Sequence, residues 1–310
     1  MTPEEPVLEL KHLRKTFGSF TAVDDVSLTV PRGSVYGFLG PNGAGKTTTL
    51  RMALSIYSPT SGSVRILGRP SALHVRHRIG FLPEERGLYK KMRAREIIAY
   101  FASLKGMSLA AARKRADDLL EQYGLGEFAR TRCEALSKGM SQKVQVLATI
   151  AHRPEFVIFD EPFSGLDPVN QQVLEQLIDD LRIAGTTIIF STHIMEHAER
   201  LCDRLVLIAR GRALFDGTLA EAKRLIPRQI LLRTTSTPDG LQRVPGVVGI
   251  ERLTNDQYAL TLTEDGEPDA VLAACFHHGL PLLAFDRSEP TLRDVFLRLV
   301  GPSDAAEVLA

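Results

Sequence analysis

Two kinds of hydrophobic pattern alternate through roughly the first 225 residues. Short runs rich in Val, Ile, Leu and Phe predict strands, and several are apolar throughout, which is typical of strands covered on both faces. The predicted strands are Val7–Leu10, Val26–Val30, Val35–Leu39, Val64–Leu67, Phe156–Phe159, Thr187–Phe190 and Leu205–Ile208. Helical spacing predicts helices at Lys46–Ser55, Ala94–Leu104, Leu109–Tyr123, Gln142–Ala151 and Val169–Ile183. This alternation predicts an α/β core with a largely parallel sheet.

The pattern changes twice along the chain. A mostly helical stretch at about residues 90–152 interrupts the strands, and we interpret it as a helical subdomain. After Leu225, Pro227 ends a helical pattern and short strands dominate. In this part we predict strands at Gln229–Arg233, Val247–Leu253, Tyr258–Leu262 and near Leu282, and helices at Asp269–His277 and Leu292–Leu299. We therefore expect a first domain over residues 1–226 and a small α+β domain over residues 227–310.

Composition and charge exclude several classes of protein. Apolar residues make up 44% of the chain, and 38 basic residues nearly balance 37 acidic ones. Neither chain-wide disorder nor a uniformly basic nucleic-acid-binding surface fits these values. The three cysteines lack metal-ligand spacing, which predicts reduced thiols. No apolar stretch is long enough to span a bilayer, and the acidic first residues do not match a signal peptide, so we expect a cytoplasmic protein.

The strongest chemical signal is a glycine-rich segment between a predicted strand and a predicted helix. It consists of Gly40, Pro41, Asn42, Gly43, Ala44, Gly45, Lys46, Thr47 and Thr48, and it fits the phosphate-loop pattern G-x-x-x-x-G-K-S/T. Backbone amides in such a loop can surround a triphosphate, and the positive end of the following helix faces the same anion. Lys46 is predicted to bridge the β- and γ-phosphates and the Thr47 hydroxyl to bind Mg²⁺. A purely structural turn is the alternative, but the flanking strand and helix favour a nucleotide site.

A second candidate site is a pair of acids at the end of a predicted buried strand. Asp160 and Glu161 follow Phe159, and neighbouring side chains on a strand diverge, so the two can serve different tasks. We predict that Asp160 holds the Mg²⁺ shell and that Glu161 acts as general base toward the attacking water. Taken alone, two acids at an exposed strand end need no functional explanation. Together with the phosphate loop they favour ATP hydrolysis.

With these motifs the sequence resembles the ATP-binding subunits of ABC transporters, from about Val7 to Leu225. The segment from Leu136 to Gln142 is similar to the family's signature sequence, although Lys138 replaces one of its two glycines and Met140 its glutamine. The resemblance implies that Ser137 and Gly139 contact the γ-phosphate. It also implies a P-loop ATPase core with a mixed, largely parallel sheet, an antiparallel β subdomain and a helical subdomain.

Five further motifs carry the same resemblance. Phe17 matches the aromatic that stacks on adenine, with a buried core Phe as the alternative. Glu84 stands where the family's Q-loop has glutamine, and its carboxylate can coordinate Mg²⁺ or water. Ser164–Asp167 is similar to the D-loop, and His193 to the switch histidine that contacts the γ-phosphate. The run from Glu84 to Tyr89 is similar to a prokaryotic export subgroup that includes sodium-efflux ATPase subunits.

The resemblance implies a mechanism and partners. Two copies pair head to tail around two ATP molecules; one supplies Lys46, Thr47, Thr48, Asp160, Glu161 and His193, and the other Ser137 and Gly139. ATP-driven closure powers export through a separate membrane permease, which contacts about Glu84–Lys105. The predicted protein is thus a homodimeric ATPase that needs ATP and Mg²⁺, binds no nucleic acid, and sits at the inner face of the cell membrane only through its permease. A regulatory or dimer-stabilising role is expected for the C-terminal domain.

Three other interpretations remain at this point. ABC ATPases without a permease act in translation, DNA repair or chromosome organisation, but they typically carry two cassettes or long coiled coils, and this chain has no sustained heptads. A P-loop kinase is disfavoured by the signature and by the Asp160–Glu161 pair. A weakly hydrolytic ATP-binding regulator is compatible with the unusual Glu84 and Lys138.

Overall fold

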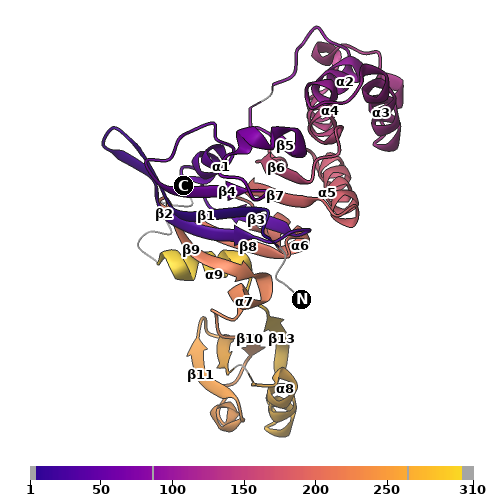
Figure 1. Cartoon of the computed structure of the whole chain (residues 1–310). Coiled ribbons are helices and arrows are strands. Elements are labelled where there is room, and N and C mark those ends of the chain that lie inside the picture. The colour runs from indigo at the N-terminus through magenta and orange to yellow at the C-terminus, as the bar shows by residue number, and fades with distance from the viewer. Residues whose placement is uncertain (1–4, 86, 264, 302–310) are drawn as a thin grey trace. The chain divides into compact units, whose positions relative to one another are not determined.

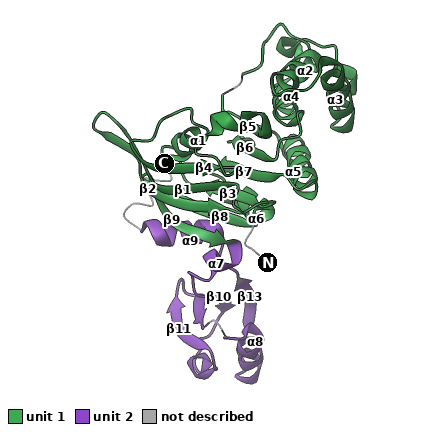
Figure 2. Cartoon of the chain, viewed as in Figure 1, with its two compact units in different colours: residues 1–218, 306–310 green, residues 219–305 purple. Residues whose placement is uncertain are grey.

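The computed structural model describes residues 5–85, 87–263 and 265–301, which divide into two compact units (Figure 2). The first unit extends to Thr218 and the second begins at Leu219, whereas the sequence predicted a boundary between residues 226 and 227. The reason for the difference is α7 (Leu219–Lys223), which contacts α9 (Leu292–Val300) of the second unit. Arg86, within the run that resembles the export subgroup, and residues 1–4 and 302–310 of the predicted domains lie outside the described residues.

A largely parallel sheet lies at the centre of the first unit (Figure 1). Its strand order is β5-β6-β7-β3-β8-β9, and every neighbouring pair is parallel except β8 and β9. The strands are β3 (Val35–Leu39), β5 (Ile79–Leu82), β6 (Phe156–Asp160), β7 (Thr187–Thr192), β8 (Arg204–Ala209) and β9 (Arg212–Thr218). All residues of β3, β6 and β7 are buried, which confirms the prediction from their uninterrupted apolar runs.

A smaller antiparallel sheet packs beside the central one. It has the order β2-β1-β4 and consists of β1 (Leu8–Phe17), β2 (Phe20–Val30) and β4 (Ser61–Ile66). Leu8 and Leu10 of β1, Phe38 of β3 and Leu50 of α1 (Lys46–Ala53) share one hydrophobic core. β1 and β2 extend past their predicted ends because their polar halves pair with each other as a hairpin.

The helical subdomain is a bundle of three helices that contact one another (Figure 1). They are α2 (Ala94–Leu104), α3 (Leu109–Gln122) and α4 (Lys138–Ile150). Helix α4 begins at Lys138 rather than at the predicted Gln142, because the Ser137 hydroxyl accepts a hydrogen bond from the Met140 amide at 3.2 Å. Likewise α5 (Pro168–Ile183) begins directly after Asp167, whose side chain accepts from the Asn170 amide. Helix α6 (Met195–Leu201) follows β7.

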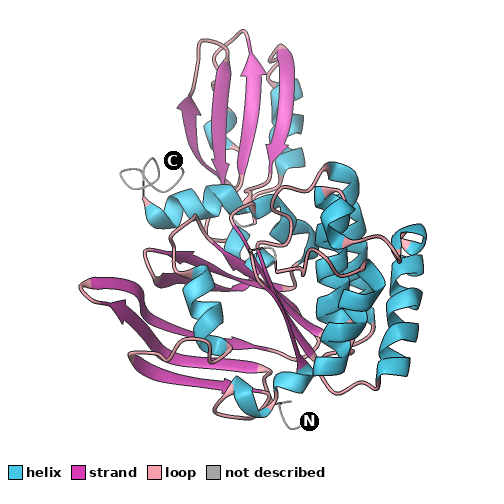
Figure 3. Ribbon diagram, turned by 90° about the horizontal axis from the view of Figure 1, so that it is seen from above, coloured by secondary structure: helices cyan, strands magenta, loops and turns pink. Residues whose placement is uncertain are grey.

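The second unit is an α+β domain with its own core. Its antiparallel sheet has the order β11-β12-β10-β13, with α8 against one face (Figure 3). The elements are β10 (Gln229–Thr234), β11 (Val247–Arg252), β12 (Gln257–Leu262), α8 (Pro268–His277) and β13 (Leu282–Ser288). Single 3-10 turns lie at Ala72–His74, Arg76–Arg78, Gly126–Phe128, Cys133–Ala135 and Leu241–Arg243. Over the described part of the chain, no helix combines the length and the hydrophobicity needed to cross a membrane.

Candidate active site at the edge of the parallel sheet

Three neighbouring strands bring the predicted chemistry to one edge of the sheet. β7 lies between β6 and β3, and the register pairs Asp160 with Ser191 and Leu39 with Thr192. The carboxyl ends of parallel strands share an edge, so the phosphate loop after β3 and the carboxylates at the end of β6 meet there with His193 after β7. Residues more than a hundred positions apart, such as Thr47 and Asp160, are thereby in hydrogen-bond contact.

The phosphate loop leaves the start of α1 open to an anion. Gly45 precedes the helix with a φ of +100°, and a Cβ there would lie 2.6 Å from the Ala22 carbonyl oxygen, so only glycine fits. No side chain among the described residues caps α1. Its first amides and its positive dipole end are therefore available to a phosphate.

Lys46 is held across this loop rather than extended into solvent. Its side chain is only 6% exposed, and Nζ donates to the carbonyl oxygens of Gly40 at 2.6 Å and Pro41 at 3.1 Å. The same ammonium lies 3.3 Å from Glu161 Oε1. The lysine thus connects the phosphate loop with the carboxylate pair before any ligand contributes a charge.

Asp160 has one satisfied and one unsatisfied carboxylate oxygen. Its Oδ1 accepts hydrogen bonds from Thr47 Oγ1 at 3.1 Å and Ser191 Oγ at 2.5 Å. Its Oδ2 is buried and has no partner among the described residues. Leaving a buried carboxylate oxygen unpaired is costly, and a bound cation would satisfy it. A hydroxyl and a carboxylate oxygen are hard ligands that suit Mg²⁺, and its remaining ligands would be water and phosphate oxygens.

That division of ligands agrees with the rest of the structure. Across the described ranges, no group of three or more His, Cys, Asp and Glu side chains is arranged to hold a metal ion by itself. Mg²⁺ usually keeps several waters and is bound by one or two protein groups together with substrate phosphates. Thr47 and Asp160 therefore fit a cation that arrives with a nucleotide.

Glu161 is placed by a strained backbone. Its φ is +48°, in the left-handed region that residues other than glycine rarely adopt. Its amide donates to Ser191 Oγ at 2.9 Å, and its Oε2 lies 3.0 Å from His193 Nδ1. Such strain persists only where the surroundings enforce it, and it concentrates at functional sites. Here it holds a buried carboxylate between Lys46 and His193.

Ser191 is a site residue that sequence reasoning missed. It contacts both acids, through Asp160 Oδ1 and the Glu161 amide, yet only His193 of the Ser191–His193 segment received a predicted role. The signal that could have found it is positional. A hydroxyl at the carboxyl end of a neighbouring parallel strand lies beside the residue with which it is in register.

Glu84 reaches the same region. A cavity of about 100 Å³ is lined by Leu82, Pro83, Glu84, Lys138, Gln142, Gln145, Asp160, Glu161 and Ser164. The structure therefore brings the predicted Q-loop carboxylate next to the Asp160–Glu161 pair. It also adds Lys138, which was not among the predicted site residues.

Ser137 and Gly139 of the signature face elsewhere. Neither lines that cavity: Ser137 is exposed, and Gly139 lies so close to α5 that a Cβ would be 2.5 Å from Asn170 Nδ2. Asp167 of the D-loop accepts hydrogen bonds from the Asn170 amide and side chain, which hold the pKa of its carboxyl below the usual value. The signature and the D-loop are thus packed together within one chain, while the Ser137 hydroxyl remains at the surface.

Phe17 ends β1 as an exposed ring. Its side chain is 45% exposed, which excludes the alternative of a core Phe. Tyr57 contacts it edge to face with ring centroids 5.7 Å apart, and Lys15 Nζ lies 5.0 Å from its centroid. Tyr57 and Lys15 were not singled out in the sequence. An exposed aromatic ring with a lysine beside it offers a surface for a planar, anionic ligand.

Comparisons with known proteins agree with this geometry. The family model described as ABC transporter matches residues 23–164, and the one described as ATP-binding protein DrrA1-3-like, C-terminal domain, matches residues 217–300. The chain is 39% identical over 297 residues to the uncharacterized ABC transporter ATP-binding protein YhaQ of Bacillus subtilis, covering 95% of this chain and 99% of that protein. It is 31% identical to the daunorubicin/doxorubicin resistance ATP-binding protein DrrA of Streptomyces peucetius, covering 96% and 93%.

Solved structures share the fold of the first unit. The ATP-binding subunit of an ABC transporter matches with a TM-score of 0.66 and 32% identity, covering 71% of this chain and 92% of that one. The dimeric ATP-binding cassette MJ0796, bound to ADP and phosphate, matches with a TM-score of 0.63 and 27% identity, covering 68% and 98%. The predicted fold class is confirmed. The chain belongs to the ABC transporter family as an ATP-binding, ATP-hydrolysing subunit, followed by a DrrA1-3-like C-terminal domain.

Proposed function

We propose that two copies of this chain close head to tail around two Mg·ATP and so power export through a separate permease at the inner face of the cell membrane. The observation that carries the nucleotide part is the unpaired, buried Asp160 Oδ2 beside the Thr47 hydroxyl and the uncapped start of α1. These groups offer a place for one cation and one polyphosphate at adjoining positions. When bound, Mg²⁺ supplies charge neutralisation at the transferring phosphate.

Each side chain has a distinct role in this proposal. Lys46 exchanges its loop carbonyls for phosphate oxygens, and Asp160 and Thr47 hold the cation. Glu161 accepts a proton from the attacking water at its Oε1, which lies 3.3 Å from the Lys46 ammonium. His193, 3.0 Å from Oε2, orients that carboxylate, and Phe17 stacks on the base.

The head-to-tail pairing is supported by an incomplete half-site. Ser137 is exposed, and its hydroxyl accepts the capping bond from the Met140 amide. Neither Ser137 nor Gly139 lines the cavity of the carboxylate pair in its own chain. Members of this family dimerise, as the MJ0796 cassette with ADP and phosphate does. A second copy would bring its signature to the γ-phosphate and exclude water.

An apolar groove supports the permease contact. A cavity of about 410 Å³ is lined by Gly80, Phe81, Pro83, Gly87, Leu88, Phe101, Lys105, Gln145, Ala148, Thr149 and His152. Beside it, Tyr89 is 55% exposed and contacts Phe101, and Leu104 is 62% exposed. Exposed aromatic and aliphatic side chains around an apolar groove are typical of a docking surface. This groove lies in the Glu84–Lys105 region predicted from the sequence to contact the permease.

Capture from native membranes tests the permease proposal. A tagged chain should retain a membrane protein, Tyr89→Asp should lose it, and both should keep basal ATPase activity. Ile183→Asp is the matched control, because Ile183 is 81% exposed at the end of α5 and outside the groove. Equal capture by Tyr89→Asp and the wild type would contradict this docking surface.

A further inference from the structure

Two unusual charges converge on the carboxylate cavity. Glu84 and Lys138 are 54 positions apart (138 minus 84), have opposite sign, and replace the neutral residues expected from the family resemblance. Both line the cavity of about 100 Å³ that also holds Asp160 and Glu161. Neither side chain has a hydrogen bond or ion pair to another described residue. Their charges are therefore not used by the scaffold.

The end of the Lys138 side chain lies over the D-loop backbone. Gly165 has a φ of +69°, and a Cβ at this position would clash with Nζ and Cε of Lys138. The lysine thus runs over a glycine next to Ser164, which itself lines the cavity. Its ammonium adds a second positive charge near the carboxylates, beside that of Lys46, which forms an ion pair with Glu161 at 3.3 Å.

We propose that Lys138 and Glu84 are a charge-compensating pair that sets the electrostatic potential felt by the γ-phosphate. This inference rests on the proposed ATP site. In it, Lys138 and Glu84 are positioning residues rather than catalytic ones. Three carboxylates and one ammonium give the cavity a net charge of −2. Lys138→Gln makes it −3 and Glu84→Gln makes it −1, whereas the double variant returns it to −2. Glu84 and Lys138 are exposed, so solvent screens part of the effect, but one unit of charge in the cavity of Asp160 and Glu161 changes the affinity for a phosphate measurably.

A double-mutant cycle tests the pair, with binding of a fluorescent ATP analogue in Mg²⁺ and the kcat and KM of hydrolysis as readouts. Lys138→Gln should weaken binding on the order of 10-fold, and Glu84→Gln/Lys138→Gln should return to within about threefold of the wild type. Lys138→Arg should behave like the wild type. The loss in Lys138→Gln should shrink in high salt, a response that a merely structural lysine would not show.

The possible outcomes distinguish a failure of the Lys138–Glu84 pair from a failure of the proposed ATP site. If the double variant binds ATP as weakly as Lys138→Gln, removing the Glu84 charge does not offset the loss of the Lys138 charge, and the pairing is wrong. If Lys138→Gln binds and hydrolyses ATP like the wild type, the pairing is also wrong while the ATP site stands. If the wild-type chain binds no ATP, the proposed function and the pair both fail.

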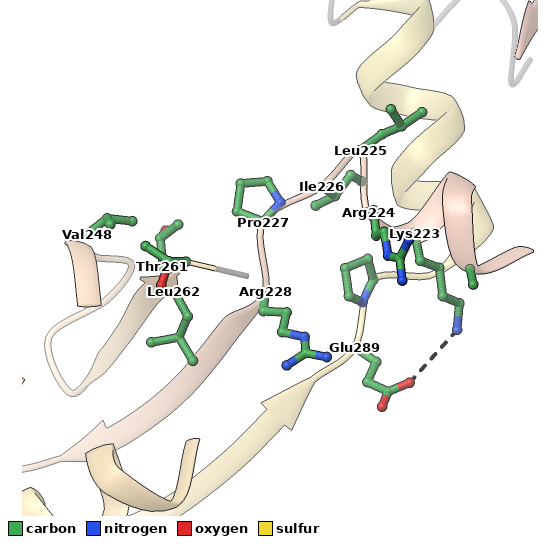
Figure 4. A pocket seen from close by; sticks show the side chains of 13 residues that line it. Lys223, Arg224, Leu225, Ile226, Pro227, Arg228, Val248, Thr261, Leu262 and Glu289 are labelled. Carbon is green, nitrogen blue, oxygen red and sulfur yellow. Dashed lines mark ion pairs between the residues drawn. The ribbon is translucent and has the colours of Figure 1, made fainter. Parts of the chain in front are cut away.

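A different observation concerns the second unit alone. A cavity of about 840 Å³ opens between the segment after α7, the sheet and the segment before α9 (Figure 4). Its lining comprises Ala220, Lys223, Arg224, Leu225, Ile226, Pro227, Arg228, Val248, Thr261, Leu262, Thr263, Glu289 and Pro290. This volume lies in the range of pockets for drug-sized ligands. The cavity is separate from the hydrophobic core on the α8 side of the sheet, to which only Leu262 of the lining residues contributes as a buried core residue.

The lining combines apolar walls with an excess of positive charge. Pro227 and Pro290 present no amide donor, and Leu225 and Val248 are 44% and 64% exposed. Lys223 forms a long ion pair with Glu289 at 4.0 Å. Arg228 points into the same space, and its guanidinium has no hydrogen bond or ion pair to a described residue (Figure 4). An apolar body with a negatively charged head complements this surface.

We infer that this cavity binds a small anionic amphiphile, whose carboxylate or phosphate head pairs with Arg228 and whose apolar part lies against Leu225 and Val248. Calorimetric titration of the full chain with decanoate and with decyl phosphate tests it. Both probes should bind, and Arg228→Glu should weaken them at least 10-fold, as expected for loss and reversal of a charged contact. Arg293→Glu, outside the lining, should bind like the wild type.

A cationic amphiphile and lipid vesicles serve as control probes for the anion-binding inference. Decyltrimethylammonium binding as tightly as decanoate would show that charge does not select the ligand. Binding of phosphatidylglycerol vesicles without binding of either monomeric probe would indicate a membrane-surface contact instead. No binding of any probe would also overturn it.

Discussion

Two regions of the first unit differ in the burial and pairing of their polar side chains. At the edge of the central sheet, Lys46, Asp160 and Glu161 are nearly buried and tied to one another, to Thr47 and to Ser191. At the start of α4 and in the Q-loop, Ser137, Lys138 and Glu84 are exposed, and the last two have no partner among the described residues. The buried groups contact one another within the chain, with Asp160 Oδ2 left unpaired, whereas the second group of side chains is open to solvent.

This difference in burial indicates which side chains act within one chain and which need a second copy of the chain. A preorganised cluster of buried charges can stabilise a transition state without reorganising at the moment of reaction. Exposed groups gain strength only when closure removes water around them. Changes at the buried face should therefore affect nucleotide binding and chemistry in one chain, whereas a change at the exposed Ser137, which does not line the carboxylate cavity, should affect only the closed assembly.

Glu161→Gln should give the largest effect. The amide keeps the size of the side chain and its position beside His193, but it cannot accept a proton from water. We expect the hydrolysis rate to fall by roughly 10²- to 10⁴-fold, with ATP binding retained and a stable ATP-bound dimer in size-exclusion chromatography. Turnover at the wild-type rate would show that Glu161 is not the base.

Lys46→Ala should come next. It removes the ammonium that contacts the loop carbonyls and Glu161, and leaves that buried carboxylate without its cation. ATP affinity should fall roughly 10- to 100-fold in an equilibrium titration. Melting curves of the variant serve as the control for folding, and unchanged affinity in a folded variant would refute the phosphate-binding role.

Ser137→Ala sharpens the comparison, because it should reduce ATPase activity roughly 10-fold without changing ATP binding by the isolated chain. It also removes the bond from the Met140 amide, at a cost of about 1 kcal/mol in stability. Ser108→Ala is the matched control: Ser108 caps α3 in the same subdomain and accepts from the Ala111 amide at 3.3 Å. Equal ATPase activities of the two variants would reduce Ser137 to a helix cap.

The smallest effect concerns His152, a half-buried group away from the reaction. Burial, with nearby Lys105, lowers the pKa of His152 from 6.5 to about 4. The unfolded chain therefore takes up a proton below pH 6.5 that the folded chain refuses down to about pH 4, so stability falls across that window. Because His152 is partly exposed, we expect a loss on the order of 1–2 kcal/mol. His152→Gln should flatten the pH dependence of denaturant unfolding between these values, and an unchanged slope would contradict it.

Local sequence patterns were enough to predict the features that depend on neighbouring residues alone. The apolar runs of β3, β6 and β7 identified buried strands, and the phosphate loop is contiguous between β3 and α1. Short or half-exposed elements escaped prediction, namely β5, β9, α6 and α7, because a few residues of mixed polarity carry little periodic signal. The start of α4 was placed late because the Ser137 cap, not the apolar pattern, sets it.

The sequence by itself determined which reactive groups the chain carries and that they stand at strand ends. Only the tertiary structure decided which of them meet. The order β6-β7-β3 puts Ser191 against both acids and Lys46 against Glu161, and Lys138 and Glu84, far apart in the sequence, line one cavity. The physical reason is that strand order and side-chain approach depend on packing between distant segments, which no local pattern encodes.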